Sequence, residues 1–137
     1  MPITLTISEG LLSADTEAEV FAGLTYALWR VAQLSGNHFM TRNVVGSSNI
    51  LPKNRIFSGG EPVPAAFIEL KLPEIALATP EARQDFITEA TTIAGEGRLS
   101  RDHIWTNVYA VDGAWGIAGR AYSNAELVGA IQSSAAD

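Results

Sequence analysis

The sequence has no cysteine, and it is poor in histidine and in positive charge. Its 137 residues include two histidines and nine Lys and Arg against fifteen Asp and Glu, a formal net charge of −6. Without cysteine there are no disulfide bonds, thiolate nucleophiles or Cys-ligated zinc. The acidic balance argues against nucleic acid or an anionic membrane as the main partner, because both are bound through clustered cations.

Long apolar runs and targeting signals are also missing. The start, Met1 to Leu5, has no basic segment followed by an apolar stretch, which excludes a typical signal peptide. The most apolar helical run, Val20 to Leu34, is interrupted by Arg30 and is too short to cross a bilayer. We therefore expect a cytoplasmic protein. Its 47% apolar and only 18% charged residues suggest that subunit interfaces are buried in addition to a core.

Hydrophobic periodicity predicts alternating strands and helices. Alternation at residues 2–8 indicates a strand with one buried face, and further strands are expected at 38–45, 65–72 and 103–111. Ser13 and Thr79 are expected to cap two helices, and Ser123 with Glu126 forms a capping box for a short terminal helix. Residues 46–60, rich in Gly, Ser, Asn and Pro, are expected to form a loop.

This order is strand–helix–strand twice, which an internal duplication explains most simply. We expect one domain over residues 1–137, with pseudo-repeats at about 2–60 and 65–122 and a C-terminal helix and tail at 123–137. The fold class is then α+β. Right-handed crossovers place both helices on one face of a four-stranded sheet. The other face needs a cover, and partner subunits are the expected one.

The residue with the clearest chemical content is Pro2. Proline after the initiator methionine permits removal of Met1, which leaves a free secondary amine at the start of a strand. An α-amino group has a pKa of about 8, and burial lowers the pKa of an amine. A prolyl amine in an apolar pocket can therefore be uncharged at neutral pH and act as a general base.

The motifs around Pro2 resemble those of the tautomerase superfamily. The start of the chain is similar to the start of 4-oxalocrotonate tautomerase over Pro2-Ile3-Thr4-Leu5-Thr6-Ile7-Ser8-Glu9-Gly10. Residues 114–119, Ala-Trp-Gly-Ile-Ala-Gly, are also similar to that protein. Residues 57–62 look like the middle of macrophage migration inhibitory factor. His38-Phe39, His103-Ile104-Trp105 and residues 56–60 look most like the group of cis-3-chloroacrylic acid dehalogenase. The resemblance implies a trimer of duplicated β-α-β subunits that needs no cofactor and no metal.

The resemblance also implies a set of site residues. Pro2 matches the catalytic proline, Trp115 the aromatic wall of the pocket, and Asn107 a polar substrate contact. Arg42 is expected on the second strand, two residues from Met40, which aligns with an arginine that reaches across the subunit interface in the family. Residues two apart on a strand share a face, so Arg42 is a candidate for binding a carboxylate. Lys71 is a second candidate for that role, although it also fits a solvated strand face.

Several expected residues are missing. Leu11 stands where 4-oxalocrotonate tautomerase has an arginine, and residues 73–76 (Pro-Glu-Ile-Ala) lack the two carboxylate-binding arginines of the dehalogenase. Trp29 aligns with that enzyme's active-site histidine, and Ile117 lies near the position of its water-activating glutamate. The key cations and acid of the dehalogenase are therefore absent, which argues against hydration and dehalogenation.

These observations favour a cofactor-independent tautomerase (isomerase) that acts through Pro2 on a small 2-keto, enol or unsaturated carboxylic acid. One alternative is a catalytically silent trimer of the same fold that binds a small ligand or serves as a scaffold. A decarboxylase or hydratase/dehalogenase of the superfamily is the second. If Met1 is retained, the nitrogen of Pro2 is an amide without basicity, and chemistry by a proline base is impossible.

Overall fold

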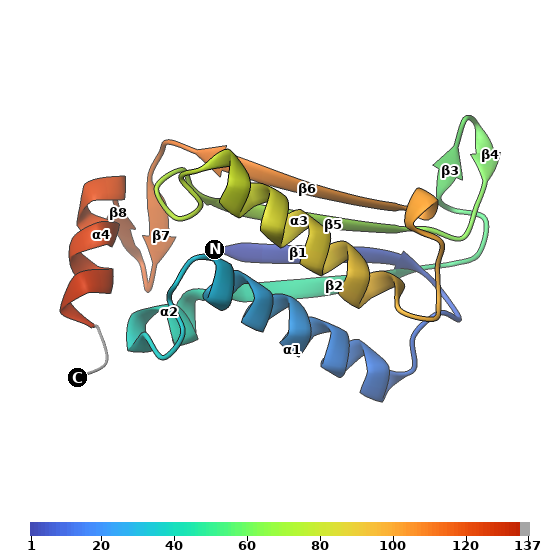
Figure 1. Ribbon diagram of the computed structural model, residues 1–137, viewed down its shortest axis with the longest axis horizontal. Coiled ribbons are helices and arrows are strands. Elements are labelled where there is room, and N and C mark those ends of the chain that lie inside the picture. The colour runs from blue at the N-terminus through green and yellow to red at the C-terminus, as the bar shows by residue number, and fades with distance from the viewer. Residues whose placement is uncertain (135–137) are drawn as a thin grey trace.

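The computed structural model describes residues 1–134. The last three residues of the expected tail, 135–137, lie outside the described part. A four-stranded sheet in the order β2-β1-β5-β6 forms the centre. Two helices, α1 and α3, cover one of its faces (Figure 1).

Two β-α-β units build this sheet. The first runs through β1 (Pro2–Ser8), α1 (Ala14–Val31) and β2 (Val45–Leu51), and the second through β5 (Ala66–Pro73), α3 (Pro80–Gly95) and β6 (Ile104–Val111). Within each unit the two long strands are parallel, while β1 and β5 pair antiparallel at the centre. The expected α+β class, with a four-stranded sheet and two helices on one face, is confirmed.

The alternation in β1 explains which face is buried. Ile3, Leu5 and Ile7 are at most 1% exposed and point to the helices. Their partners from β5 and α3 complete the core: Ile68, Leu70, Leu72, Phe86 and Ala90. Burying this apolar layer is the main force that holds the helices on the sheet.

The expected helix caps are present. The side chains of Ser13, Thr79 and Ser123 each accept a hydrogen bond from the backbone N–H three residues later. Pro80 follows its cap directly, where its missing N–H costs nothing. Ser123 and Glu126 form the reciprocal capping box of α4 (Asn124–Ser133). Local sequence therefore sets the starts of all three helices.

The expected strand at 38–45 is wrong. Residues His38–Asn43 form a short helix, α2, and the strand β2 begins only at Val45. The side chain of Asn37 caps α2 by accepting from Met40 N at 3.0 Å. Because α2 is helical, Met40 is buried and Arg42 is exposed, so the two do not share a strand face. The expected loop at 46–60 is correspondingly shorter, since β2 takes residues up to Leu51 and pairs with β1 in register Pro2↔Val45.

Two short hairpins lie at opposite ends of the molecule (Figure 1). The pair β3 (Phe57–Ser58) and β4 (Glu61–Pro62) turns through Gly59 and Gly60, both at positive φ. The pair β7 (Trp115–Ile117) and β8 (Arg120–Tyr122) turns through Ala118 at φ 51° and Gly119 at φ 79°. Hairpin turns with two residues at positive φ match the twist of the strands, which explains the glycines at these positions. A 3-10 turn, η1 (Arg101–His103), precedes β6.

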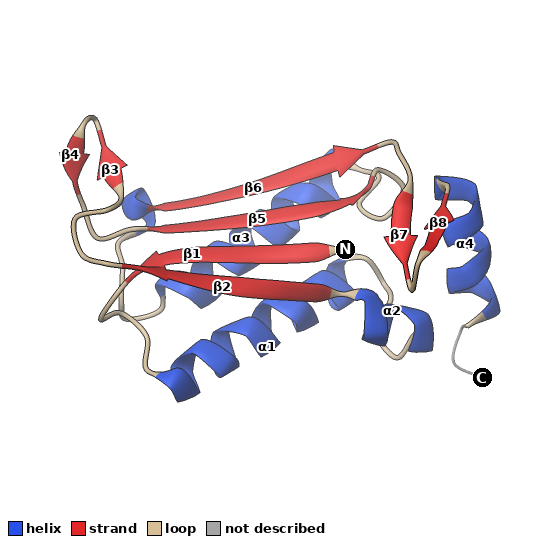
Figure 2. Ribbon diagram, turned by 180° about the vertical axis from the view of Figure 1, so that it is seen from behind, coloured by secondary structure: helices blue, strands red, loops and turns tan. Residues whose placement is uncertain are grey.

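The second face of the sheet is not covered by any helix of the described chain (Figure 2). Register places Phe67 opposite Trp105 and Lys71 opposite Tyr109 on this face. The rings of Phe67 and Trp105 stack with centroids 5.4 Å apart, while Val45, Tyr109 and Val111 are 54%, 43% and 41% exposed. We call this surface the open sheet face. Across residues 1–134, none of the helices is both long and apolar enough to span a bilayer.

Candidate active site

Pro2 lies at the end of the sheet where β1 and β2 start and where β5 and β6 end. Beside it is a cavity of about 140 Å³, which we call the Pro2 cavity. Segments far apart in the sequence meet here, because α2, the β7–β8 hairpin and α4 all pack at this end of the sheet (Figures 1 and 2). Its lining is Met1, Pro2, Phe39, Asn43, Val45, Pro73, Trp115, Gly116, Ile117 and Leu127.

No charged side chain of the described residues lines the Pro2 cavity, and the chain's own amino group is its cation. The Met1 amine donates a hydrogen bond to the carbonyl oxygen of Asn43 at 2.7 Å, and Val45 N donates to the Met1 carbonyl at 3.2 Å. Burial lowers the pKa of the Met1 amine below its ordinary value of 8.0. An amine at this end of β1 is therefore in an environment that favours its neutral form.

Two hydrogen bonds in series fix the indole of Trp115 against the Pro2 cavity. Trp115 Nε1 donates to Asn124 Oδ1 at 3.2 Å, and Asn124 Nδ2 donates to Asp112 Oδ1 at 3.2 Å. Asn124 is the first residue of α4, directly after the Ser123 cap. The start of α4 therefore orients the aromatic wall that the sequence assigned to Trp115.

Arg42 lies in an adjacent groove rather than in the Pro2 cavity. This groove, which we call the Arg42 groove, has a volume of about 720 Å³ and shares Phe39, Asn43 and Ile117 with the Pro2 cavity. Its other lining residues are His38, Thr41, Arg42, Ala118 and Ser134. Arg42 is exposed on α2, and no hydrogen bond or ion pair of its side chain occurs among the described residues. A carboxylate in this groove would meet a guanidinium close to the cavity.

Lys71 and Asn107 lie on the open sheet face and do not line the Pro2 cavity within the described chain. Ile3 pairs with Leu70, so Lys71 is the next residue of β5 beside Pro2 and faces the same way. Asn107 pairs with Glu69, which lies two residues further from Pro2 along β5 than Lys71 does. One chain therefore brings Pro2 and Trp115 together, puts Arg42 next to them, and leaves Lys71 and Asn107 on the surface expected to meet a partner.

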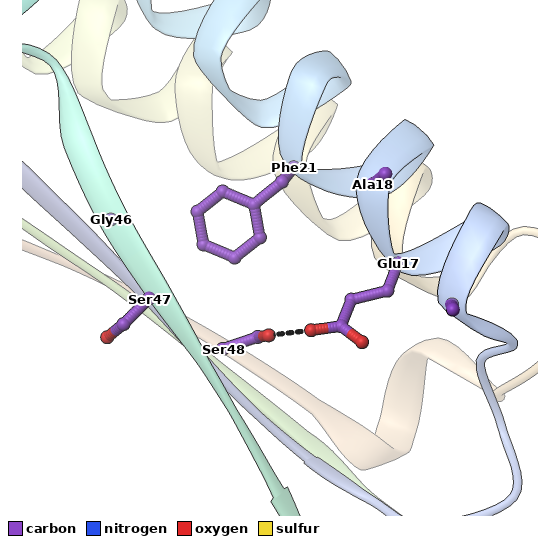
Figure 3. Close-up of a pocket in the computed structure, with 7 residues that line it drawn as sticks. Glu17, Ala18, Phe21, Gly46, Ser47 and Ser48 are labelled. Carbon is purple, nitrogen blue, oxygen red and sulfur yellow. Dashed lines mark hydrogen bonds between the residues drawn. The ribbon is translucent and has the colours of Figure 1, made fainter.

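A second groove, between α1 and β2, has a volume of about 360 Å³ (Figure 3). Glu17 and Ser48 face each other across it, and Ser48 Oγ donates a hydrogen bond to Glu17 Oε1. Phe21 approaches the strand closely because Gly46 has no Cβ, which would overlap the Phe21 ring and the Ile3 carbonyl. The glycine thus has a packing role. A carboxylate and a serine without histidine do not make an activated nucleophile.

Among residues 1–134 there is also no group of three or more His, Asp or Glu side chains placed to hold a metal ion. His38 lies on the rim of the Arg42 groove, and His103 ends the 3-10 turn before β6.

Sequence reasoning missed the cavity residues that come from α2 and α4. Phe39 and Asn43 were assigned to a strand, and Leu127 was seen only as part of a terminal helix. Asn37 is a local signal for α2, because asparagine is a favoured N-cap residue and its side chain accepts a hydrogen bond from Met40 N. No local pattern indicates that α4 packs beside Pro2.

Comparisons with known proteins place the fold. No family model matches the chain, and no curated protein matches it. Among solved structures, a fused 4-OT wild-type symmetric trimer superposes with a TM-score of 0.77 at 12% identity, over 93% of this chain and 98% of that one. A member of the cis-3-chloroacrylic acid dehalogenase family superposes with a TM-score of 0.72 at 19% identity, over 88% of this chain and 82% of that one. Macrophage migration inhibitory factor of Toxoplasma gondii superposes with a TM-score of 0.72 at 12% identity, over 89% of this chain and 100% of that one. The chain therefore has the fold of the tautomerase superfamily, as its motifs indicated.

Proposed function

We propose that this chain is a cofactor-independent tautomerase in which Pro2, freed by removal of Met1, moves a proton within a small 2-keto, enol or unsaturated carboxylic acid. The observation that carries the proposal is the Pro2 cavity. Its lining contains no charged side chain, and burial there already lowers the pKa of the chain's amine. A neutral prolyl nitrogen in the same place would accept a proton at neutral pH.

The proton transfer needs no other reactant. The Pro2 nitrogen takes the proton of an enol hydroxyl or of an acidic carbon and returns it to the other position, so atoms and electrons balance within the substrate. Trp115 and Phe39 supply apolar walls that keep water out. A dry cavity strengthens the interaction between a hydrogen-bond donor and the negative charge that develops on the substrate oxygen.

Arg42 is the proposed partner of the substrate carboxylate. The Arg42 groove shares Phe39, Asn43 and Ile117 with the Pro2 cavity, and a small acid that spans both spaces would place its carboxylate at Arg42. A guanidinium can bind a carboxylate through two parallel hydrogen bonds. Arg42 has no competing acidic partner among the described ion pairs.

A homotrimer is part of the proposal. The open sheet face holds the stacked pair Phe67 and Trp105 at one end and exposed Val45 and Tyr109 at the other, and leaving these large apolar side chains in water is costly. The fused 4-OT neighbour is a symmetric trimer. Assembly through this face would bring Asn107 and Lys71 against a neighbouring subunit, where they can serve as polar substrate contacts. We further propose that the two β-α-β units are repeats of one ancestral unit, and that the protein works in the cytoplasm.

A catalytically silent small-ligand-binding trimer is the second candidate, and it is the expected form of a protein that retains Met1. With Met1 in place, its amine is bonded to Asn43 and the Pro2 nitrogen is an amide. A hydratase or dehalogenase is less well supported, because no carboxylate of the described residues lines the Pro2 cavity or the Arg42 groove to activate water.

The two candidates are separated by the intact mass of the natively expressed protein, followed by a panel of enol and unsaturated 2-oxo acids. We expect the mass of a chain that begins at Pro2 and ketonisation of at least one enol acid, measured by ultraviolet absorbance. A uniform Met1 start would contradict the proline-base mechanism and support the silent binder.

A further inference from the structure

A second apolar cavity adjoins the Pro2 cavity on the side away from Arg42. It has a volume of about 200 Å³ and lies between the end of α1, the connection after β5, and α4. Its lining is Met1, Ala32, Leu34, Pro73, Ile75, Ala76, Leu127, Val128, Ile131 and Gln132. We call it the α4 chamber. Among the described residues, 1–134, none of the side chains in this lining is charged.

Met1 is one of three residues in the wall shared by the α4 chamber and the Pro2 cavity. Met1, Pro73 and Leu127 line both spaces, whereas the α4 chamber and the Arg42 groove have no lining residue in common. The three spaces therefore follow one another in the order Arg42 groove, Pro2 cavity, α4 chamber. Removing Met1 would take away one of the three residues in this shared wall and so free space between the α4 chamber and the Pro2 cavity.

These three spaces together suit a substrate that is charged at one end and apolar at the other. An apolar cavity of about 150 Å³ stays dry and accepts a benzene-sized group, and the α4 chamber is somewhat larger than that. Its walls are aliphatic side chains with Gln132 as the one polar member, and Ile75 at its edge is 40% exposed, which leaves a route to solvent. A second charged group on the substrate would find no counter-ion there.

We propose that the α4 chamber is a binding site for the aliphatic tail of the substrate, which is a 2-oxo or enol monocarboxylic acid with a tail of up to about six carbons. The carboxylate lies toward Arg42, the reacting carbon lies at Pro2, and the tail extends past the position that Met1 vacates. The proposal rests on the proposed function for the reacting end and on the shape of the α4 chamber for the tail. It narrows the substrate class from small organic acids to acids with an alkyl chain.

The test uses a homologous series on the chain that begins at Pro2. Each added methylene buried in the chamber is expected to raise kcat/KM for the enol acid, and the affinity for the saturated straight-chain alkanoate, by about three- to fourfold. The gain is expected to stop at about six carbons, when the chamber is full. Calorimetric titration with acetate through octanoate measures the affinity without any turnover.

The matched variants lie on α4. Ile131→Trp fills the chamber and is expected to abolish the dependence of affinity and of kcat/KM on chain length. Val128→Phe serves the same purpose if Ile131→Trp folds poorly. Ser133→Trp, on an exposed position of the same helix, is expected to keep the dependence.

The outcomes separate this proposal from the proposed function. Affinity that is independent of chain length, or a dependence that survives in Ile131→Trp and Val128→Phe, would overturn the tail site even if enol acids are converted. An alkanoate series with the expected slope in a protein that converts no enol acid would uphold the chamber and contradict the tautomerase.

Discussion

Replacing Pro2 by alanine is expected to lower kcat/KM for enol–keto conversion by about two to four orders of magnitude, the usual contribution of a positioned general base. Alanine changes the basicity of the terminal nitrogen and removes the ring that fixes its direction. Pro2 faces away from the core layer of Ile3, Leu5 and Ile7, so the fold is expected to survive. Stopped-flow or steady-state absorbance measures the loss, and thermal unfolding with light scattering checks fold and assembly.

A matched control separates the nitrogen of Pro2 from its side chain. A chain extended by one residue before Pro2 keeps the ring but turns the nitrogen into an amide, and it is expected to lose as much activity as Pro2→Ala. Thr4→Ala, on the same face of β1 and outside the Pro2 cavity, is expected to keep full activity. Normal turnover by the extended chain would rule out the prolyl nitrogen as the base.

The second large effect concerns the open sheet face. Trp105→Glu is expected to convert the proposed trimer into monomers at micromolar concentration, because burying a carboxylate without a partner costs several kcal/mol. Trp105 stacks on Phe67 on the open sheet face, near the start of the edge strand β6, so the new carboxylate replaces one member of an apolar pair on this face. Sedimentation velocity measures the mass of the particle. Dissociation is also expected to lower the activity, because Asn107 and Lys71 act across the interface in the proposed trimer.

The control for this variant places the same charge on the other side of the molecule. Ala22 is exposed on α1, which packs on the opposite face of the sheet, so Ala22→Glu is expected to leave the trimer intact. If Trp105→Glu sediments like the parent protein, the open sheet face is not the subunit interface.

The sequence predicts most of the central sheet and its two helices because local signals and burial agree there. Alternation in β1 corresponds to its buried and open faces, and Ser13, Thr79 and Ser123 cap helices as expected. The four-stranded sheet with both long helices on one side then follows from the handedness of β-α-β crossovers.

The segment around α2 could not be predicted because long-range contacts determine it. Asn37 caps α2, and its Nδ2 also donates to the carbonyl of Ile131 at 2.8 Å, a residue 94 positions away. The next strand, β2, contains glycine, serines and asparagine that are typical of loops, and it forms because β1 offers a parallel edge.

The sequence likewise predicts only part of the candidate site. Pro2 and Trp115 were identified from motifs, and they do line one cavity. Arg42 was placed on a strand and lies instead on α2, in the neighbouring groove. Leu127 and the chain from Asn124 to Asp112 depend on how α4 packs, which no local pattern encodes.

The central claim is that the Pro2 nitrogen is a free amine whose pKa is lowered by the apolar cavity around it. A pH titration of the ¹⁵N resonance of Pro2 in the natively expressed, assembled protein tests this claim most directly. The account predicts one titration with a pKa clearly below the ordinary α-amino value of about 8, because burial disfavours the charged form. An amide resonance that does not titrate, or a pKa at or above that value, would contradict it.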